Sequence, residues 1–403
     1  MEQAEVPPQR AVCDPCPNED AVASIWSTLC NGFSAGKHWL LLLLQSLQNV
    51  RTTPLAHSLA TYRQMVNWDE ACIRCIAIHP TSRHQALITS EDIVHLFVNW
   101  VDPAAQLQAP EQVDLYCVAY RPCTNRELAV GCAAGIYIWR NVSSQLWGKR
   151  LLSHKAHIHV TSVQWNQPGT TLVSVAMGSR QIIVWNTDSA QTIRMLSASI
   201  SFLLYSPDFQ LLFGASSDAG ADVCYVERRC WQLEHILAER PIQTAAWTAG
   251  STYLLFVQKD DTHLYSITRY ADLGVFLKPQ LFWTFELVAD LHEIFVLGKQ
   301  KHHGQAQAIA VDPLNIYLAV IYKRQPFVLL CKLSMKKHAK LRIIPWEYIH
   351  CDDEQARGQC AYATCMCFGH AKENGRRRTL TIGWNTGYYQ VEWLKTDNYK
   401  RCI

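Results

Sequence analysis

The sequence predicts an all-β fold that is assembled from repeated units. The clearest unit is Asp114–Trp139, which contains three short apolar runs separated by turns at Arg121-Pro122 and Ala134-Gly135. Short apolar runs bounded by proline and glycine are typical of strands. The middle run, Leu128–Cys132, is wholly apolar, which is typical of a strand buried on both faces. One such unit cannot bury both of its faces, so it needs copies beside it.

Seven stretches share this pattern, and the spacing of their first turns indicates the fold class. The first four steps between turns are about 40–45 residues, the period of WD-type propeller blades. The last two steps are longer, and the extra residues fall between units, in Arg269–Gly304 and Met335–Gln359. A longer loop there leaves the units intact because it adds little closure entropy. The turns lie at Pro80, Pro122, Gln167–Gly169, Pro207, Ala249–Gly250, Pro313 and near His370.

The period predicts a seven-bladed WD-repeat β-propeller with an N-terminal helical segment; the alternative is two separate β-sandwiches. Each unit supplies three clear strands, so the fourth, outer strands are expected in the links, for example in Gln145–Ser153 and Cys230–Leu237. For the outer strand of the seventh blade, only Val6–Val12 looks extended enough. The predicted domains are a flexible N-terminus at 1–17, the helical segment at 18–71, the propeller at 72–395 and a short C-terminal tail at 396–403.

The residues before the first unit have helical patterns. One helix is expected at about Ala21–Phe33, and Pro54 suits the first turn of another at about Leu55–Val66. Between them, Lys37–Val50 is apolar on most faces, which predicts a buried helix. This helix would either pack against the propeller or dock a partner. Its candidate partner-binding residues are Trp39, Leu41 and Leu44.

The repeat Leu151–Asn186 best resembles the WD pattern, in which a histidine near the start and a closing Trp-Asp pair fix the blade turn by hydrogen bonds. His154 and His157 precede its first strand, and Trp185-Asn186 closes it, so Asn186 replaces the usual aspartate. The predicted structural blade positions here and in other units are His154, Trp165, Trp185, Asn186, Trp139 and Trp384.

Composition excludes several classes of protein. The chain has 403 residues, of which 49% are hydrophobic and 18% charged, as in globular proteins. A net charge of +3 lacks the strong basicity of nucleic-acid-binding domains. The 16 cysteines are scattered and no signal peptide is evident, which predicts reduced thiols in the cytosol or nucleus. The longest apolar run, Ile316–Tyr322, is too short to span a membrane.

No catalytic motif stands out, so neither an enzyme nor a bound cofactor is expected. Two C-x-x-C pairs, Cys13 with Cys16 and Cys72 with Cys75, lie too far apart for a zinc ribbon, which predicts unrelated thiols. In the denser group of Cys351, Cys360, Cys365 and Cys367, no zinc site is expected, because Cys365 and Cys367 share a strand face and are expected to be core residues. Three polar or basic stretches are expected to be solvated loops, namely His302-His303, Met335–Lys340 and Arg376–Arg378.

Four stretches resemble the aladin family of WD-repeat nucleoporins. Together with the helical lead-in Gly36–Trp68, which fits the layout of that family, they cover most of the chain. One of the stretches, Leu287–Glu293, lies in the insertion Arg269–Gly304. Similarity to a family is unusual in an insertion, so this match is informative. The four stretches are Val66–Pro80, Asp114–Trp139, Leu287–Glu293 and Thr381–Leu394.

The resemblance implies a non-enzymatic scaffold of the nuclear pore complex that supports protein import. Proteins of this family are held at the nuclear envelope by a transmembrane nucleoporin of the pore membrane ring, and they have been linked to spindle assembly. The implied partners are that protein, other nucleoporins and spindle or mitotic kinase factors, without direct nucleic-acid binding or a membrane span. The implied locations are the nucleus, the nuclear envelope, the nuclear pore and, in mitosis, the spindle poles. The alternative is a cytosolic WD-repeat adaptor that recruits peptide partners or substrates.

Overall fold

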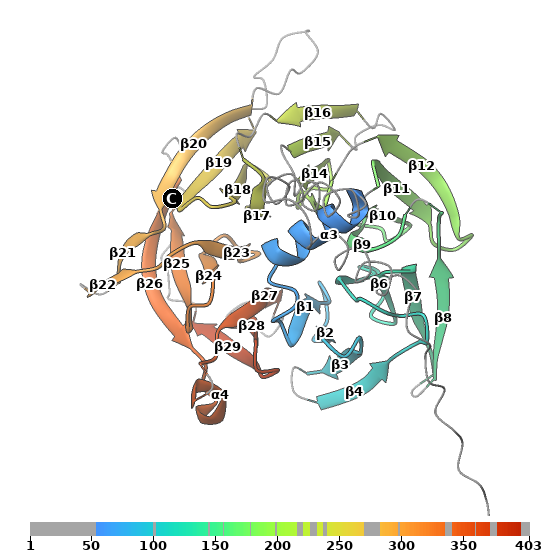
Figure 1. Cartoon of the computed structure of the whole chain (residues 1–403), viewed down its shortest axis with the longest axis horizontal. Coiled ribbons are helices and arrows are strands. Elements are labelled where there is room, and N and C mark those ends of the chain that lie inside the picture. Colours follow the sequence, from blue (N-terminus) through green and yellow to red (C-terminus); the bar gives the residue numbers. More distant parts are fainter. Residues whose placement is uncertain are drawn as a thin grey trace, which may run out of the picture. The chain divides into compact units, whose positions relative to one another are not determined.

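Antiparallel strands form small sheets that are arranged around a ring, with the first strand of each sheet nearest the centre (Figure 1). The computed structural model describes residues 54–99, 102–143, 146–155, 157–177, 179–197, 200–215, 221–225, 232–236, 240–269, 283–296, 299–334, 341–358, 360–370 and 377–395. Within this part of the chain, no helix is both long and apolar enough to cross a membrane.

Six of the sheets have four strands each, and we call them blades one to six. Blade one contains β1 (Ile73–Ile78), β2 (Gln85–Thr89), β3 (Val94–Val98) and β4 (Asp102–Leu107). Blade two contains β5 (Cys117–Tyr120), β6 (Glu127–Cys132), β7 (Gly135–Ser143) and β8 (Leu146–Leu152). Blade three contains β9 (Val160–Trp165), β10 (Thr171–Ala176), β11 (Gln181–Asn186) and β12 (Gln191–Ser197).

The other three complete blades follow the same order. Blade four contains β13 (Phe202–Tyr205), β14 (Leu211–Ala215), β15 (Ala221–Tyr225) and β16 (Gln232–Ile236). Blade five contains β17 (Ile242–Trp247), β18 (Tyr253–Gln258), β19 (His263–Arg269) and β20 (Trp283–Asp290). Blade six contains β23 (Ala306–Val311), β24 (Tyr317–Tyr322), β25 (Phe327–Ser334) and β26 (Arg342–His350).

The last sheet, blade seven, has three strands among the described residues: β27 (Ala363–His370), β28 (Arg377–Trp384) and β29 (Tyr389–Lys395). The predicted propeller is therefore confirmed, but among the described residues the number of four-stranded blades is six rather than seven. Val6–Val12, the segment considered for the remaining outer strand, lies outside the described residues.

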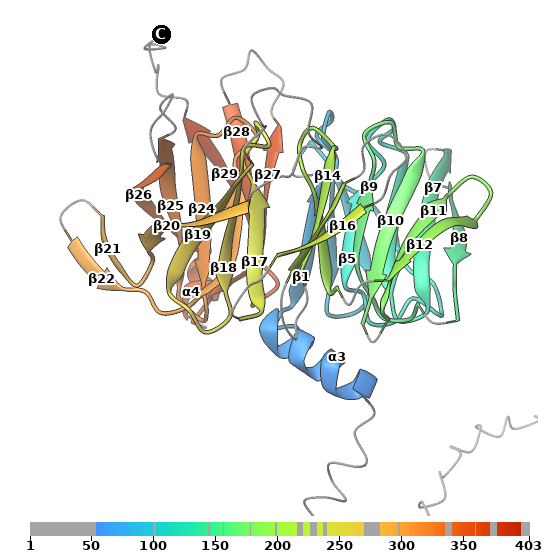
Figure 2. The ribbon, with the colours of Figure 1, turned by 90° about the horizontal axis from the view of Figure 1, so that it is seen from above.

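Outer strands occupy the links between the predicted units, as expected. β8 and β16 lie within the two links named above, and the two long insertions supply β20 and β26. The first insertion also forms the hairpin β21 (Glu293–Val296) and β22 (Lys299–His302), which projects from the outer wall (Figure 2). The second insertion adds the short helix α4 (Glu354–Gly358). Both insertions therefore extend the blades rather than interrupt them.

The core lies between neighbouring blades, which explains the wholly apolar second strands. Every residue of β6 and of β24 is buried, because each face of the strand packs against an adjacent sheet. Leu128 and Val130 of β6, for example, lie in one cluster with Ile88 of blade one. Helix α3 (Pro54–Met65), predicted at Leu55–Val66, is confirmed and belongs to the same unit as the propeller.

Blades one and seven close the ring by side-chain packing. Thr364 Oγ1 donates a hydrogen bond to the Ile73 carbonyl oxygen at 2.7 Å, and the rings of Phe97 and Tyr389 lie 4.9 Å apart. A Cβ added at Gly383 would lie 2.9 Å from Ile73 Cγ2. Glycine is therefore required where β28 approaches β1.

Candidate functional site

A chain of buried hydrogen bonds joins three side chains of blade three. His157 Nε2 lies 2.7 Å from Ser174 Oγ, and Trp185 Nε1 donates to the same hydroxyl oxygen at 2.7 Å. We call His157, Ser174 and Trp185 the blade-three chain. Burial lowers the pKa of His157 to about 4, so the imidazole is neutral near neutral pH. Because the chain joins the link before β9 to strands β10 and β11, it fixes the entry of the polypeptide into the blade.

The structure corrects the predicted role of His154 and shows the contacts of Asn186. His154 was expected to make the side-chain contact, but it is half-buried in the link, where its carbonyl oxygen accepts the N–H of His157 at 2.9 Å. Asn186 Oδ1 accepts the backbone N–H groups of Asp188 and Ser189 at 3.0 and 3.2 Å. Asparagine therefore holds the β11–β12 turn as an Asx-turn.

Two further blades place a polar residue at the position of His157. In blade two, Trp139 Nε1 donates to Gln112 Oε1 at 2.9 Å. In blade six, His303 is fully buried and its Nε2 lies 2.6 Å from the Tyr348 hydroxyl. The expectation that His303 lies in a solvated loop is therefore wrong. Its spacing from the following strand, the same as that of His157, was the signal in the sequence.

The other predicted tryptophans are buried but make different contacts. Trp165 Nε1 donates to the Ala119 carbonyl oxygen at 3.2 Å, which ties blade three to blade two. Trp384 lies on β28 and donates to Gln390 Oε1 of β29 at 3.1 Å. Trp39, Leu41 and Leu44 lie outside the described residues, so their role stays a prediction.

Helix α3 lies across one end of the ring's centre (Figures 1 and 2). Its buried side chains Tyr62 and Met65, together with Trp68 after the helix, form a cluster with Tyr116 and Met177. The helix ends before Asn67, whose φ of 55° is the left-handed conformation that asparagine tolerates at a helix C-terminus.

The carbonyl oxygen of Met65 is held by two blades. Gln243 Nε2 donates to it at 2.7 Å and Gln307 Nε2 at 2.6 Å. The last carbonyls of a helix have no partner within the helix, so these amides satisfy one of them. Both glutamines occupy the register shift of an innermost strand, β17 or β23. A bulge redirects a side chain, and here it turns an amide toward α3.

Two guanidinium groups lie over the ring of Trp68. Arg63 lies 4.0 Å and Arg74 3.4 Å from the ring centroid. Each cation has an acidic partner, because Arg63 pairs with Asp114 at 2.7 Å and Arg74 with Asp92 at 3.2 Å. The stacked cations and their carboxylates therefore fasten the chain after α3 to blades one and two.

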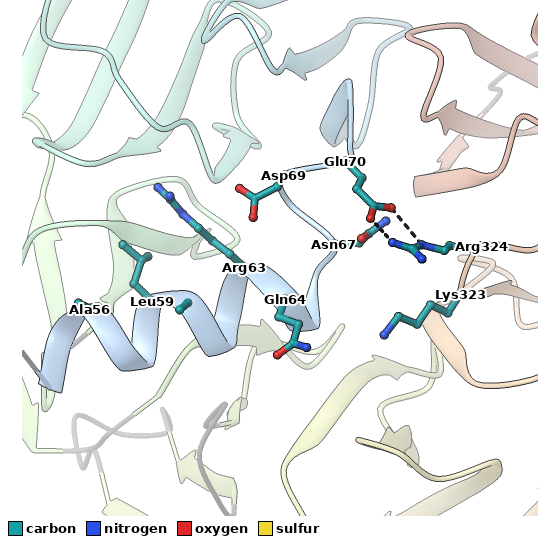
Figure 3. A pocket seen from close by; sticks show the side chains of 10 residues that line it. Ala56, Leu59, Arg63, Gln64, Asn67, Asp69, Glu70, Lys323 and Arg324 are labelled. Atoms are coloured by element: carbon teal, nitrogen blue, oxygen red, sulfur yellow. Dashed lines mark hydrogen bonds and ion pairs between the residues drawn. The ribbon is translucent and has the colours of Figure 1, made fainter. Parts of the chain in front are cut away.

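A cleft of about 500 Å³, the helix cleft, opens beside α3 (Figure 3). Its opposite rim is the turn between β24 and β25, which carries Lys323 and Arg324. Glu70 is paired with Arg324 and accepts a hydrogen bond from the Tyr362 hydroxyl at 2.7 Å. These hydrogen bonds from Arg324 and Tyr362 lower the pKa of Glu70 to about 2. The α3 wall is lined by Ala56, Leu59, Ala60, Arg63 and Gln64.

The helix cleft combines an apolar stretch of α3 with charged side chains. Arg63 is paired with Asp114, and Glu70 with Arg324. In the part of the chain that the structure describes, no group of three or more His, Cys, Asp or Glu side chains could hold a metal ion. Cys365 and Cys367 lie against the core near β1, and burial raises the pKa of Cys367 to about 12. Cys13 and Cys16 lie outside the described residues.

One basic residue expected at a solvated hairpin tip is instead a buried ion-pair partner. Arg378 is 6% exposed, and its guanidinium lies 3.1 Å from the fully buried carboxylate of Asp312. The pair joins blades six and seven. Arg376 and the basic stretch Met335–Lys340 lie outside the described residues.

The ring of sheets and the blade-three chain define a WD-type β-propeller. The fold by itself does not identify the function, which depends on the sites that the fold carries. No protein-family model matches the chain. Among solved structures, the chain is similar to the β-propeller domain of Cps50 (Swd1) from Myceliophteria thermophila, with 11% sequence identity and a TM-score of 0.49 over 62% of this chain and 79% of that one.

Proposed function

We propose that this protein is a scaffold component of the nuclear pore complex. A transmembrane nucleoporin anchors it at the nuclear envelope, and it supports protein import into the nucleus. Other nucleoporins bind the propeller, and spindle or mitotic kinase factors bind it in mitosis. The proposal is supported by the resemblance of four stretches to the aladin family, of which Val66–Pro80 joins a helix end directly to β1.

The docking of α3 is the observation that carries the proposal. Met65 is held by blades five and six, and Trp68 by blades one and two. The chain before Pro54 therefore leaves the propeller from a fixed point. A partner bound by the apolar segment Lys37–Val50 would be coupled to the propeller through a short connection, as an anchored scaffold requires.

Imaging of a fluorescent fusion in living cells tests the proposal. The expected signal is a punctate nuclear rim, and Leu41→Asp with Leu44→Asp should disperse it without changing the melting temperature of the purified protein. A matched control, Leu146→Asp with Leu314→Asp, changes two leucines that are 59% and 56% exposed on the propeller and should keep the rim. Retention of the rim by the first variant, with an unchanged melting temperature, would contradict the anchoring role of the apolar segment.

The second candidate function is a cytosolic adaptor that recruits peptide partners or substrates. It is favoured by the helix cleft, because the exposed cations Lys323 and Arg324 face the small side chains of α3 in a space that could hold a peptide (Figure 3). A diffuse cytosolic signal from the unmodified fusion would favour this function over the nuclear pore.

A further inference from the structure

A second cleft, of about 430 Å³, opens between blades one and two, and we call it the interblade cleft. It is lined at the β1–β2 link by His84, at the β5–β6 link by Asn125 and Arg126, and at the end of β7 by Asn141. Helix α3 contacts the chain before β5, at the other end of blade two, through the ion pair between Arg63 and Asp114. Because the strands are antiparallel, the interblade cleft lies at the opposite end of the blades from α3.

The composition of β4 explains why this space is not filled. The pairing of β3 with β4 shifts between Leu96 and Phe97, whose partners are Ala105 and Pro103, so Ala104 is left without a partner. Such a bulge bends the strand locally. Two alanines in succession also leave little side-chain volume there. A smaller surface depression of about 220 Å³ is lined by the same alanines.

The polar side chains that line the interblade cleft comprise one cation and neutral groups that can both donate and accept hydrogen bonds. They include the guanidinium of Arg126 and the amides of Asn125 and Asn141. Among the side chains that the structure describes, the lining contains no carboxylate. The nearest acidic side chain in sequence, Glu127, is buried and already paired with Arg121 and Arg140 at 3.1 and 2.8 Å. The cleft therefore favours an anionic group.

The remaining walls are apolar and aromatic. Trp147 is half-buried and Tyr120 buried, and both line the cleft with Leu96 and Val98. The volume lies within the range of about 300–1,000 Å³ that is typical of ligand pockets. A ligand that fits both walls carries a carboxylate next to an apolar side chain, which is the chemistry of an acidic peptide.

We propose that the interblade cleft binds a short acidic peptide segment of a partner protein. Arg126 pairs with a carboxylate of that segment, the asparagine amides hold its backbone, and an apolar side chain packs against Trp147. A nucleic acid is disfavoured, because one arginine with a net charge of +3 for the chain is far from a basic stripe. The site is separate from the α3 face, so its failure would leave the proposed anchoring untouched.

Fluorescence anisotropy with the full-length protein tests the site. The probe is a short fluorescein-labelled peptide of alternating glutamate and leucine, and the same peptide with glutamine in place of glutamate is the control probe. The acidic peptide should bind and the control should bind weakly. Arg126→Glu should weaken binding by about tenfold or more, because a charge-assisted contact is lost and a like charge is introduced.

Two further variants distinguish peptide binding in the interblade cleft from non-specific attraction of the peptide to positive charge. Arg180→Glu makes the same charge change at an exposed position in blade three and should bind the peptide as the unmodified protein does. Ala104→Trp fills the cleft without changing the charge and should abolish binding, which also covers the case in which Arg126→Glu does not fold. Equal weakening by the two charge variants, absence of binding, or equal competition by a single-stranded oligonucleotide would each overturn the proposal.

Discussion

The buried imidazole of His157 predicts that the propeller loses stability in mildly acidic solution. Burial lowers the pKa of His157 from 6.5 to about 4 in the folded chain, whereas the unfolded chain titrates near the ordinary value. Between these values the unfolded chain binds a proton that the folded chain does not. The free energy of unfolding therefore falls as the pH decreases from 6.5 toward 4, and above 6.5 the contribution is absent.

The magnitude follows from the two pKa values. From about pH 7 to about pH 5, His157 alone should lower the free energy of unfolding by about 2 kcal/mol. Blade two supplies a matched control, because Gln112 there bonds Trp139 directly and Val130 takes the place of Ser174. The double variant His157→Gln, Ser174→Val copies this arrangement into blade three and removes the titrating group.

Urea unfolding of both proteins, followed by tryptophan fluorescence at the two pH values, measures the effect. Burial also lowers the pKa values of His79 and His159, but these groups are common to both proteins. The change in the difference between the two proteins therefore isolates His157. If both proteins lose the same stability between about pH 7 and about pH 5, the reasoning that His157 is buried as a neutral ring is refuted.

Three further predictions concern packing. Trp139→Ala should lower the free energy of unfolding by about 3–5 kcal/mol, measured by urea unfolding, because the side chain is 5% exposed. Arg378→Ala should cost about 3–5 kcal/mol in the same assay because it removes the cation paired with the buried carboxylate of Asp312. Replacing the pair by methionine and leucine should recover most of the loss, and no recovery would argue against the buried charge as the cause. Trp68→Ala should release α3 from the ring, because Trp68 packs in one cluster with Tyr62 and Met65 of the helix. Trypsin should then cleave after Arg63 faster, while the blades stay resistant. An unchanged cleavage rate would show that Trp68 does not hold the helix.

The fold class could be predicted from the sequence because its signals are local and repeated. Turns at Pro80, Pro122 and Gln167–Gly169 follow one another at the period of a blade, and Pro54 marks the start of α3. The count of complete blades could not be predicted in the same way, because an outer strand need not be adjacent in sequence to the strand that it pairs with.

The candidate site was far less predictable. His154 and His157 have similar local sequence, and only the packing against Ser174 distinguishes them. His303 and Arg378 lie in polar stretches that are typical of solvated loops. Yet His303 is buried beside Tyr348 of blade six, and Arg378 of blade seven is buried against Asp312 of blade six. Burial at such positions depends on neighbours that the local pattern does not contain.

The sequence by itself determined that the chain repeats a strand unit, that a helix leads into the first blade, and that no enzyme motif is present. These properties depend on hydrophobic periodicity and turn chemistry over a few residues at a time. The tertiary structure alone decided that α3 docks on the ring, through contacts between Met65 and glutamines that are 178 and 242 residues away. It also decided where the interblade cleft opens. The register shift of β4 and its two alanines leave a space only because blade two lies beside them. Side-chain contacts over such separations arise from the closure of the ring, and no local pattern encodes them.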